Sequence, residues 1–215
     1  MIDAAAWDHD ACGVGLIADR HNRASHEWLA RGLEALTRLT HRGATGDGHG
    51  AADGAGVLTA IPWQWLQTRL PAAFADAPDA RAAGMCFLAA GSPAESRRII
   101  ADALEDEGWG QLTWRGVPLD RSVLSAAERA SQPQIEQVFA LHQSSPMWPA
   151  WRLERSLYRA RVAAEARLSA AGLNEAAVVS LSLRTIVYKA LVAPADLGRF
   201  YPDLADPNYA TPFTV

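Results

Sequence analysis

Apolar side chains recur at helical spacing most clearly between residues 25 and 40. Apolar positions recur there three and four residues apart along one face, which predicts an amphipathic helix with Ser25 as its N-cap. The face that this spacing collects is Trp28, Leu29, Gly32, Leu33, Leu36 and Leu39. The segments 92–108 and 151–170 are also predicted to be helices.

The segment 92–108 carries helix signals at both of its ends. Ser92 and Glu95 have the spacing of a capping box, and Pro93 stands in the first turn, where a missing N–H costs nothing. Gly108 follows the last apolar position and is typical of a helix end. We therefore expect a helix that begins at Ser92 and stops before Gly108.

Shorter apolar runs between the helical segments predict β-strands. The runs are 12–18, 54–62, 84–91, 111–119, 134–142, 176–183 and 185–192. The last two are predicted to pair as a hairpin across Leu183 and Arg184. Strands follow one another too often for a parallel βαβ repeat, so we predict an α+β fold with helices outside stacked antiparallel sheets.

Composition limits the partners and the compartment that the chain suggests. Its 215 residues, 49% of them hydrophobic, favour one globular domain. The net charge is -4, with 20 basic and 24 acidic residues interspersed, so we expect no nucleic acid and no membrane as partners. No signal peptide is apparent at the N-terminus, which favours a cytoplasmic location.

Only two cysteines, Cys12 and Cys86, are present, and neither a four-thiolate metal site nor a disulfide framework can be built from them. The six histidines show no ligand pair at helical spacing, so we expect no metal and no cofactor in this chain. Cys86 lies within a predicted strand and is expected in the core. Cys12 opens an apolar run, and its simplest interpretation is also that of a small buried side chain.

Four stretches of sequence, taken together, resemble one known family. They are "DACGVGLIAD" (10–19), "LTHRGA" (39–44), "DGAGVLTAIP" (53–62) and the long segment 180–206. The chain resembles over almost its whole length the amino-terminal glutaminase domain of the glutamate synthase large subunit, a class II glutamine amidotransferase among the N-terminal-nucleophile (Ntn) hydrolases. This resemblance implies a four-layer αββα sandwich, incomplete in this chain.

The resemblance gives Cys12 a chemical role. It implies that residues 1–11 are a propeptide and that 12–215 is the N-terminal part of the glutaminase domain, so that processing frees the α-amine of Cys12. An α-amine with a pKa of about 7.7 to 8.0 is a suitable base for the thiol near neutral pH. The resemblance also places Arg42 and Gly43 near this nucleophile, although Arg42 can equally be a cation at a helix end.

As a function, the resemblance implies hydrolysis of L-glutamine to glutamate and ammonia through a thioester on Cys12. The ammonia would pass to a synthase domain in the remainder of the large subunit and serve the reductive amination of 2-oxoglutarate. FMN and an iron-sulfur cluster are implied for that remainder, with a small electron-transfer subunit as a further partner. Ammonia assimilation and glutamate biosynthesis would be the role of the whole enzyme.

Two departures from the family keep alternatives open. The loop 44–53 is not readily aligned, and the chain ends at Val215, before the family's carboxylate-binding arginine, its Asn-Gly oxyanion hole and its aspartate for the substrate amine. We therefore expect the 215 residues alone to be inactive. Another class II amidotransferase, and a non-catalytic module that keeps the fold, remain alternatives.

Overall fold

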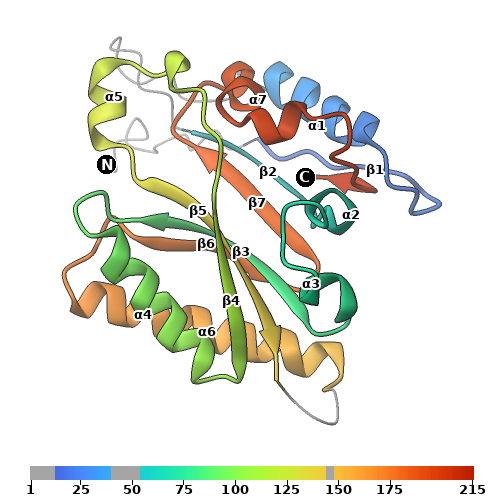
Figure 1. Ribbon diagram of the computed structural model, residues 1–215. Coiled ribbons are helices and arrows are strands. Elements are labelled where there is room, and N and C mark those ends of the chain that lie inside the picture. Colours follow the sequence, from blue (N-terminus) through green and yellow to red (C-terminus); the bar gives the residue numbers. More distant parts are fainter. Residues whose placement is uncertain (1–12, 40–53, 144–147) are drawn as a thin grey trace, which may run out of the picture.

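Two four-stranded antiparallel sheets form the centre of the protein (Figure 1). The computed structural model describes residues 13–39, 54–143 and 148–215. The strand order is β1-β8-β2-β7 in the first sheet and β4-β5-β3-β6 in the second. The two sheets are stacked, which confirms the predicted α+β class with stacked antiparallel sheets.

The strands and helices have the following bounds. The strands are β1 Ile17–Ala18, β2 Ala55–Ala60, β3 Arg81–Leu88, β4 Trp109–Gly116, β5 Gln134–His142, β6 Ala177–Ser182, β7 Thr185–Ala190 and β8 Phe213–Thr214. The α-helices are α1 His26–Arg38, α2 Trp63–Leu66, α3 Ala73–Asp76, α4 Pro93–Glu105, α5 Ala126–Ser131, α6 Ala150–Ala170 and α7 Leu197–Phe200. Short 3-10 turns are η3 Arg121–Val123, η4 Pro194–Asp196 and η5 Pro202–Ala205.

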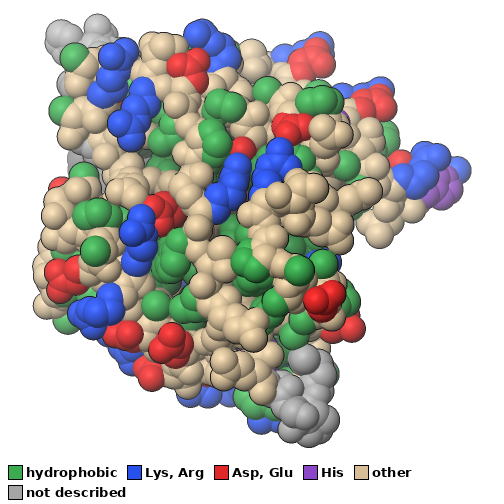
Figure 2. All heavy atoms as spheres, viewed as in Figure 1, with side chains coloured by type: hydrophobic (Ala, Val, Ile, Leu, Met, Phe, Trp, Pro, Cys, Tyr) green, Lys and Arg blue, Asp and Glu red, His purple; other side chains and the backbone are tan. Residues whose placement is uncertain are grey.

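Helices flank the strands at both ends of the view in Figure 1. Helices α4 and α6 lie below the β4-β5-β3-β6 sheet, and α1 and α7 lie above the strands. Acidic and basic side chains are interspersed over the face drawn in Figure 2. The described part of the chain contains no helix long and apolar enough to span a membrane.

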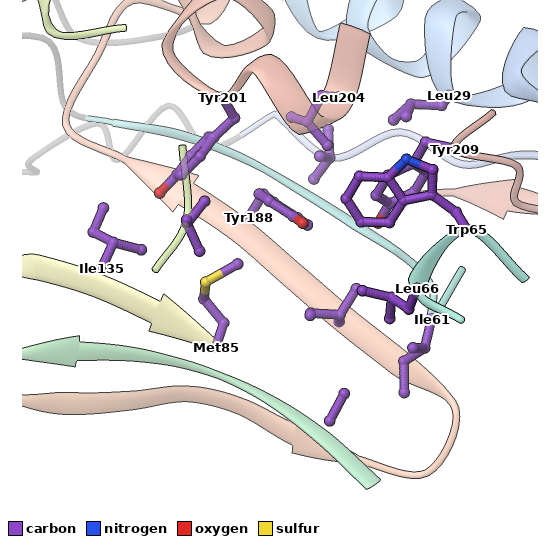
Figure 3. Close-up of a cluster of buried hydrophobic side chains, with 14 of the residues drawn as sticks. Leu29, Ile61, Trp65, Leu66, Met85, Ile135, Tyr188, Tyr201, Leu204 and Tyr209 are labelled. Carbon is purple, nitrogen blue, oxygen red and sulfur yellow. The ribbon is translucent and has the colours of Figure 1, made fainter. Parts of the chain in front are cut away.

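Two apolar clusters hold these layers together. One joins α4 and α6 to the second sheet, and its centre includes Leu104, Leu153 and Leu157, none more than 1% exposed. The other lies between the sheets and reaches α1 and α7. In Figure 3, Tyr188 and Tyr209 lie within this second cluster. We call the first the helix–sheet core and the second the inter-sheet core.

The predicted helices are confirmed, but one predicted cap is wrong. Ser25 caps α1, since its hydroxyl accepts a hydrogen bond from the Glu27 N–H at 3.1 Å. Pro93 begins α4, but the Ser92 side chain makes no capping hydrogen bond. The Ser96 hydroxyl instead donates to the Ser92 carbonyl at 3.0 Å and accepts from the Ala89 N–H at 3.3 Å. At the start of α4, the side chain of Ser96 therefore forms hydrogen bonds with the backbone, and that of Ser92 does not cap the helix.

The predicted hairpin between 176–183 and 185–192 is wrong. Both strands exist, but β6 pairs with β3 in the second sheet and β7 pairs with β2 in the first. The chain crosses between sheets at Leu183, whose N–H donates to Glu154 Oε1 at 3.0 Å. The Ser182 hydroxyl accepts from the next two N–H groups, of Arg184 and Thr185. Side chains therefore replace the strand-to-strand bonds that a hairpin would have made.

The predicted first strand is also too long. Within the described residues 13–18 of that segment, only Ile17–Ala18 is a strand, and residues 13–16 have no regular structure. Val14 and Leu16 are exposed. Glycines on either side of Val14 supply no side chain to pack and raise the entropic cost of an extended segment, which explains the shortening.

Candidate functional site

A cavity of about 310 Å³ lies where the segment before β1 meets α1, β2 and β8. Its described lining is Gly13, Val14, Gly15, Leu16, Ile17, Gly32, Ala35, Leu36, Leu39, Gly56, Val57, Thr214 and Val215. The segment before β1, which directly follows Cys12, forms one wall. Gly13, the residue that follows the predicted nucleophile in the sequence, therefore lines a cavity.

Gly32 sets the distance between α1 and β8 at this cavity. A Cβ atom on Gly32 would lie 2.4 Å from Thr214 Cγ2, which is closer than real atoms approach. The Thr214 hydroxyl donates to the Trp28 carbonyl on the same helix at 3.1 Å. The absence of a side chain at Gly32 thus allows helix and strand to touch.

Backbone hydrogen bonds fix the strands that carry the cavity walls. The N–H and carbonyl of Val215 each pair with Leu58 of β2 at 2.9 Å. The Asp19 N–H donates to the Pro212 carbonyl, also at 2.9 Å, which attaches the end of β1 to the chain before β8. The segment that leads from Gly13 into β1 is therefore held against a paired β8.

The described lining supplies shape rather than reactive groups. It contains no ionisable side chain, and its only hydroxyl, on Thr214, already donates to a backbone carbonyl. Chemistry at this cavity would need groups from neighbouring residues. The predicted site residues Cys12, Arg42 and Gly43 lie outside the described residues, and so does His41.

The second thiol is placed where sequence analysis expected it. Cys86 lies in β3, is completely buried and belongs to the helix–sheet core. Burial, with the nearby Glu136 carboxylate, raises the pKa of the Cys86 thiol. A thiol that stays protonated in an apolar environment is inert, so Cys86 is a structural residue.

Neither an iron-sulfur cluster nor a flavin fits the residues at this cavity. Clusters require several thiolates, and the one described thiol is buried in the helix–sheet core. Nowhere in the described ranges do three or more His, Cys, Asp or Glu side chains gather as metal ligands. The described lining also offers no cation to a flavin phosphate.

A buried polar network inside the inter-sheet core was not anticipated. Arg115 donates to both carboxylate oxygens of Asp203 at 2.7 Å, and the Tyr188 hydroxyl donates to the same carboxylate at 3.0 Å. Gln137 donates to the Tyr188 hydroxyl at 2.7 Å. Burial, with neighbouring Tyr209 and Asp203, raises the pKa of Tyr188 well above its usual range. The network fastens β4 and β5 of one sheet to β7 of the other.

This network continues to the wall of the cavity. The hydroxyls of Thr59 and Tyr209 are 2.7 Å apart, and Thr59 is the register partner of Thr214 in β8. Tyr188 and Tyr209 rings are in edge contact with centroids 6.1 Å apart. No periodicity signals these contacts, but the segment 180–206, which carries much of the family resemblance, supplies Tyr188 and Asp203.

The sequence of the chain matches the model of one protein family. The family model described as "Glutamine amidotransferases class-II" matches residues 12–215, beginning at Cys12. The chain belongs to the class II glutamine amidotransferases.

Three curated relatives of this amidotransferase domain are named as glutamate synthases. The chain is 38% identical to "Ferredoxin-dependent glutamate synthase" of Pyropia yezoensis, with 97% of this chain and 14% of the relative covered. It is 34% identical to "Ferredoxin-dependent glutamate synthase 2, chloroplastic" of Arabidopsis thaliana, covering 97% and 13%. It is 33% identical to "Glutamate synthase [NADPH] large chain" of Bacillus subtilis, covering 97% and 14%.

The matches cover almost all of this chain but only a small part of each relative. The chain spans about 14% of the length of these relatives and corresponds to the N-terminal part of glutamate synthase large chains. One relative is named chloroplastic and another is named for NADPH, so neither the compartment nor the electron donor follows from the comparison.

Proposed function

We propose that this amidotransferase domain hydrolyses L-glutamine through a thioester on Cys12 and delivers ammonia within a glutamate synthase. The observation that carries the proposal is the match of residues 12–215, which begins at Cys12. The cavity lined by the following residues, Gly13–Ile17, supports it. The three relatives named above are glutamate synthases, which supports a role for this domain within such an enzyme.

The reaction begins when the free α-amine of Cys12 accepts the thiol proton. The sulfur attacks the side-chain amide carbon of glutamine, and the C–N bond of the resulting tetrahedral intermediate breaks. Ammonia leaves with the proton that the amine returns. Water then attacks the thioester, the C–S bond breaks, and glutamate is released with the thiol restored.

The proposed base requires processing of the N-terminus. An amide nitrogen is no base, so residues 1–11 are proposed to be a propeptide and 12–215 the part of the glutaminase domain that this chain contains. The free amine has an ordinary pKa of about 7.7 to 8.0 and is partly unprotonated near neutral pH. Arg42 and Gly43 are proposed to lie near the nucleophile, Arg42 as a charge that braces the site and Gly43 as backbone that allows close approach.

The remaining parts of the proposal concern the whole enzyme. A synthase domain outside this chain would use the ammonia to aminate 2-oxoglutarate, with FMN and an iron-sulfur cluster there and a small electron-transfer subunit as partner. The predicted Ntn-type four-layer arrangement is supported by the family match and by helices on both sides of the stacked sheets (Figure 1). The cytoplasmic location and the inactivity of the 215 residues alone stay predictions.

Replacing the nucleophile in the full-length protein tests the proposal. Cys12→Ala should abolish glutamine-dependent glutamate synthesis and spare synthesis from added ammonium, because only glutamine hydrolysis uses the thiol. The glutamine-dependent rate should fall by at least about 10⁴-fold, the order of effect seen when a nucleophile is removed from a catalytic unit. Both rates are measured on the same preparation, and its N-terminus is determined by intact mass.

Cys86→Ala is the matched control for this experiment. Cys86 is the other thiol of the chain and lies in the core, so its replacement should leave the ratio of the two rates unchanged. Equal loss of both activities in Cys12→Ala would show a structural role for Cys12. An active enzyme that retains residues 1–11 would remove the proposed base.

A further inference from the structure

The outer face of α6 carries an unusual set of exposed side chains. Trp151, Tyr158 and Val162 are 66%, 67% and 48% exposed, and exposed apolar side chains that gather on one face are typical of interaction sites. Together with Arg155 they stand at i, i+4, i+7 and i+11, which places them on one stripe of the helix. We define the α6 outer face as Trp151, Arg152, Arg155, Tyr158, Arg159 and Val162.

This face is basic as well as aromatic. Arg152 stacks over the Trp148 ring at 3.7 Å from the ring centroid, and neither it nor Arg155 forms an ion pair within the described ranges. Arg159 pairs with Glu107 at 3.0 Å. The acidic residues of α6 are engaged elsewhere, Glu154 with the β6–β7 crossing and Glu165 with Arg161. Within the described ranges, Arg152 and Arg155 therefore leave positive charge on this face that no ion pair neutralises.

A recess adjoins the stripe and can receive an acidic side chain. Its volume is about 270 Å³, and its described lining is Glu107, Trp148, Trp151, Arg152, Arg155, Ser156 and Arg159. Tryptophan, tyrosine and arginine are the residues most often found at the centres of protein interfaces. Guanidinium groups also bind carboxylates in a two-pronged manner.

We propose that the α6 outer face docks onto an acidic protein surface of the glutamate synthase that lies outside this chain. The inference rests on the proposed function in one respect, that this domain works within a longer enzyme. Most of the relatives' length lies outside the matched region, so a covering surface is available there. Two arginines without an ion pair in the described ranges, beside exposed aromatic rings, favour carboxylates on that surface.

A second copy of this chain would fit the face poorly. A two-fold axis through the middle of the stripe brings the same residues of both copies together, because an isologous interface uses one patch twice. Arg155 and Arg159 of the two copies would then approach one another. Like charges in a desolvated contact repel, so an acidic partner surface is favoured over self-association.

Cysteine labelling in the full-length gene product tests the docking directly. Arg155→Cys should react with a charged maleimide at least about tenfold more slowly than Arg98→Cys on α4, a difference of about 1.4 kcal/mol. Arg98 is the matched control, since it is an exposed arginine on the neighbouring helix. Peptide mass spectrometry reads each site separately, so glutamine turnover does not enter the result.

A second variant tests whether the surface that docks onto the α6 outer face is acidic. Arg155→Lys keeps the charge and provides an amine, and a zero-length carbodiimide should then link residue 155 to an Asp or Glu outside residues 1–215. Equal labelling at positions 155 and 98 would overturn the proposal. Slow labelling without an acidic cross-link would overturn the acidic surface in favour of an apolar cover. Slow labelling that appears only at high protein concentration would overturn it in favour of a second copy of this chain. A failed Cys12→Ala test would leave these readouts untouched.

Discussion

The two cores of the molecule are built on different principles. The helix–sheet core joins α4 and α6 to one sheet mainly through aliphatic side chains, such as Leu104 and Leu157. The inter-sheet core contains several aromatic rings, and the hydroxyl of one of them, Tyr188, meets a buried ion pair between Arg115 and Asp203. Periodicity therefore predicts the first core well, whereas the second depends on contacts between residues far apart in the sequence.

The largest predicted loss of stability comes from breaking the buried ion pair of the inter-sheet core. Asp203→Ala removes the carboxylate that Arg115 and Tyr188 contact and leaves an uncompensated charge in the inter-sheet core. Breaking a buried ion pair from one side costs about 3–5 kcal/mol of unfolding free energy. Urea unfolding followed by circular dichroism measures this loss. Glu165→Ala, at an exposed pair with Arg161, should cost less than about 0.5 kcal/mol, and an equal cost at both sites would contradict the network's role.

A truncation in the helix–sheet core should cost somewhat less. Leu157 is completely buried, and Leu157→Ala should lower the unfolding free energy by about 3 kcal/mol through lost burial and the cavity that remains. The double variant with Asp203→Ala should be additive within about 0.5 kcal/mol, because the two residues share no partner. Strong non-additivity would show that the two cores are not independent.

The same contrast explains what could be predicted from the sequence. The strand 134–142 and the helix 151–170 were predicted nearly at their observed bounds. The helix has buried positions at helical spacing, and the strand is a short run that is buried along almost its whole length. The crossing at Leu183 was predicted as a hairpin, because the Glu154 carboxylate that accepts its N–H comes from a distant helix. For the site, the resemblance named Cys12, Arg42 and Gly43, which lie outside the described residues. The Thr59–Tyr209 contact behind the cavity carries no local signal.

A smaller effect is expected where α1 meets the cavity wall. Gly32→Ala puts a Cβ atom into Thr214, and overpacking of this kind costs about 1–3 kcal/mol. The higher helix propensity of alanine offsets about 1 kcal/mol of that cost. Thermal or urea unfolding should still show a net loss of stability. At Gly91, between β3 and α4, a Cβ atom would meet nothing within 4 Å, so Gly91→Ala should be close to neutral; a loss there as large as at Gly32 would contradict the steric explanation.

The smallest predicted effect separates two serines that the sequence presents alike. Both precede a helix and both were predicted to cap it, but only the Ser25 hydroxyl accepts a backbone N–H of its helix. Ser25→Ala should therefore lower the unfolding free energy by about 1 kcal/mol, the usual contribution of an N-cap. Ser92→Ala removes no capping bond and should change the unfolding free energy by less than about 0.5 kcal/mol, as at an ordinary surface position. Parallel urea titrations of the two variants resolve this difference. A loss at Ser92 equal to that at Ser25 would mean that Ser92 forms the capping box in solution.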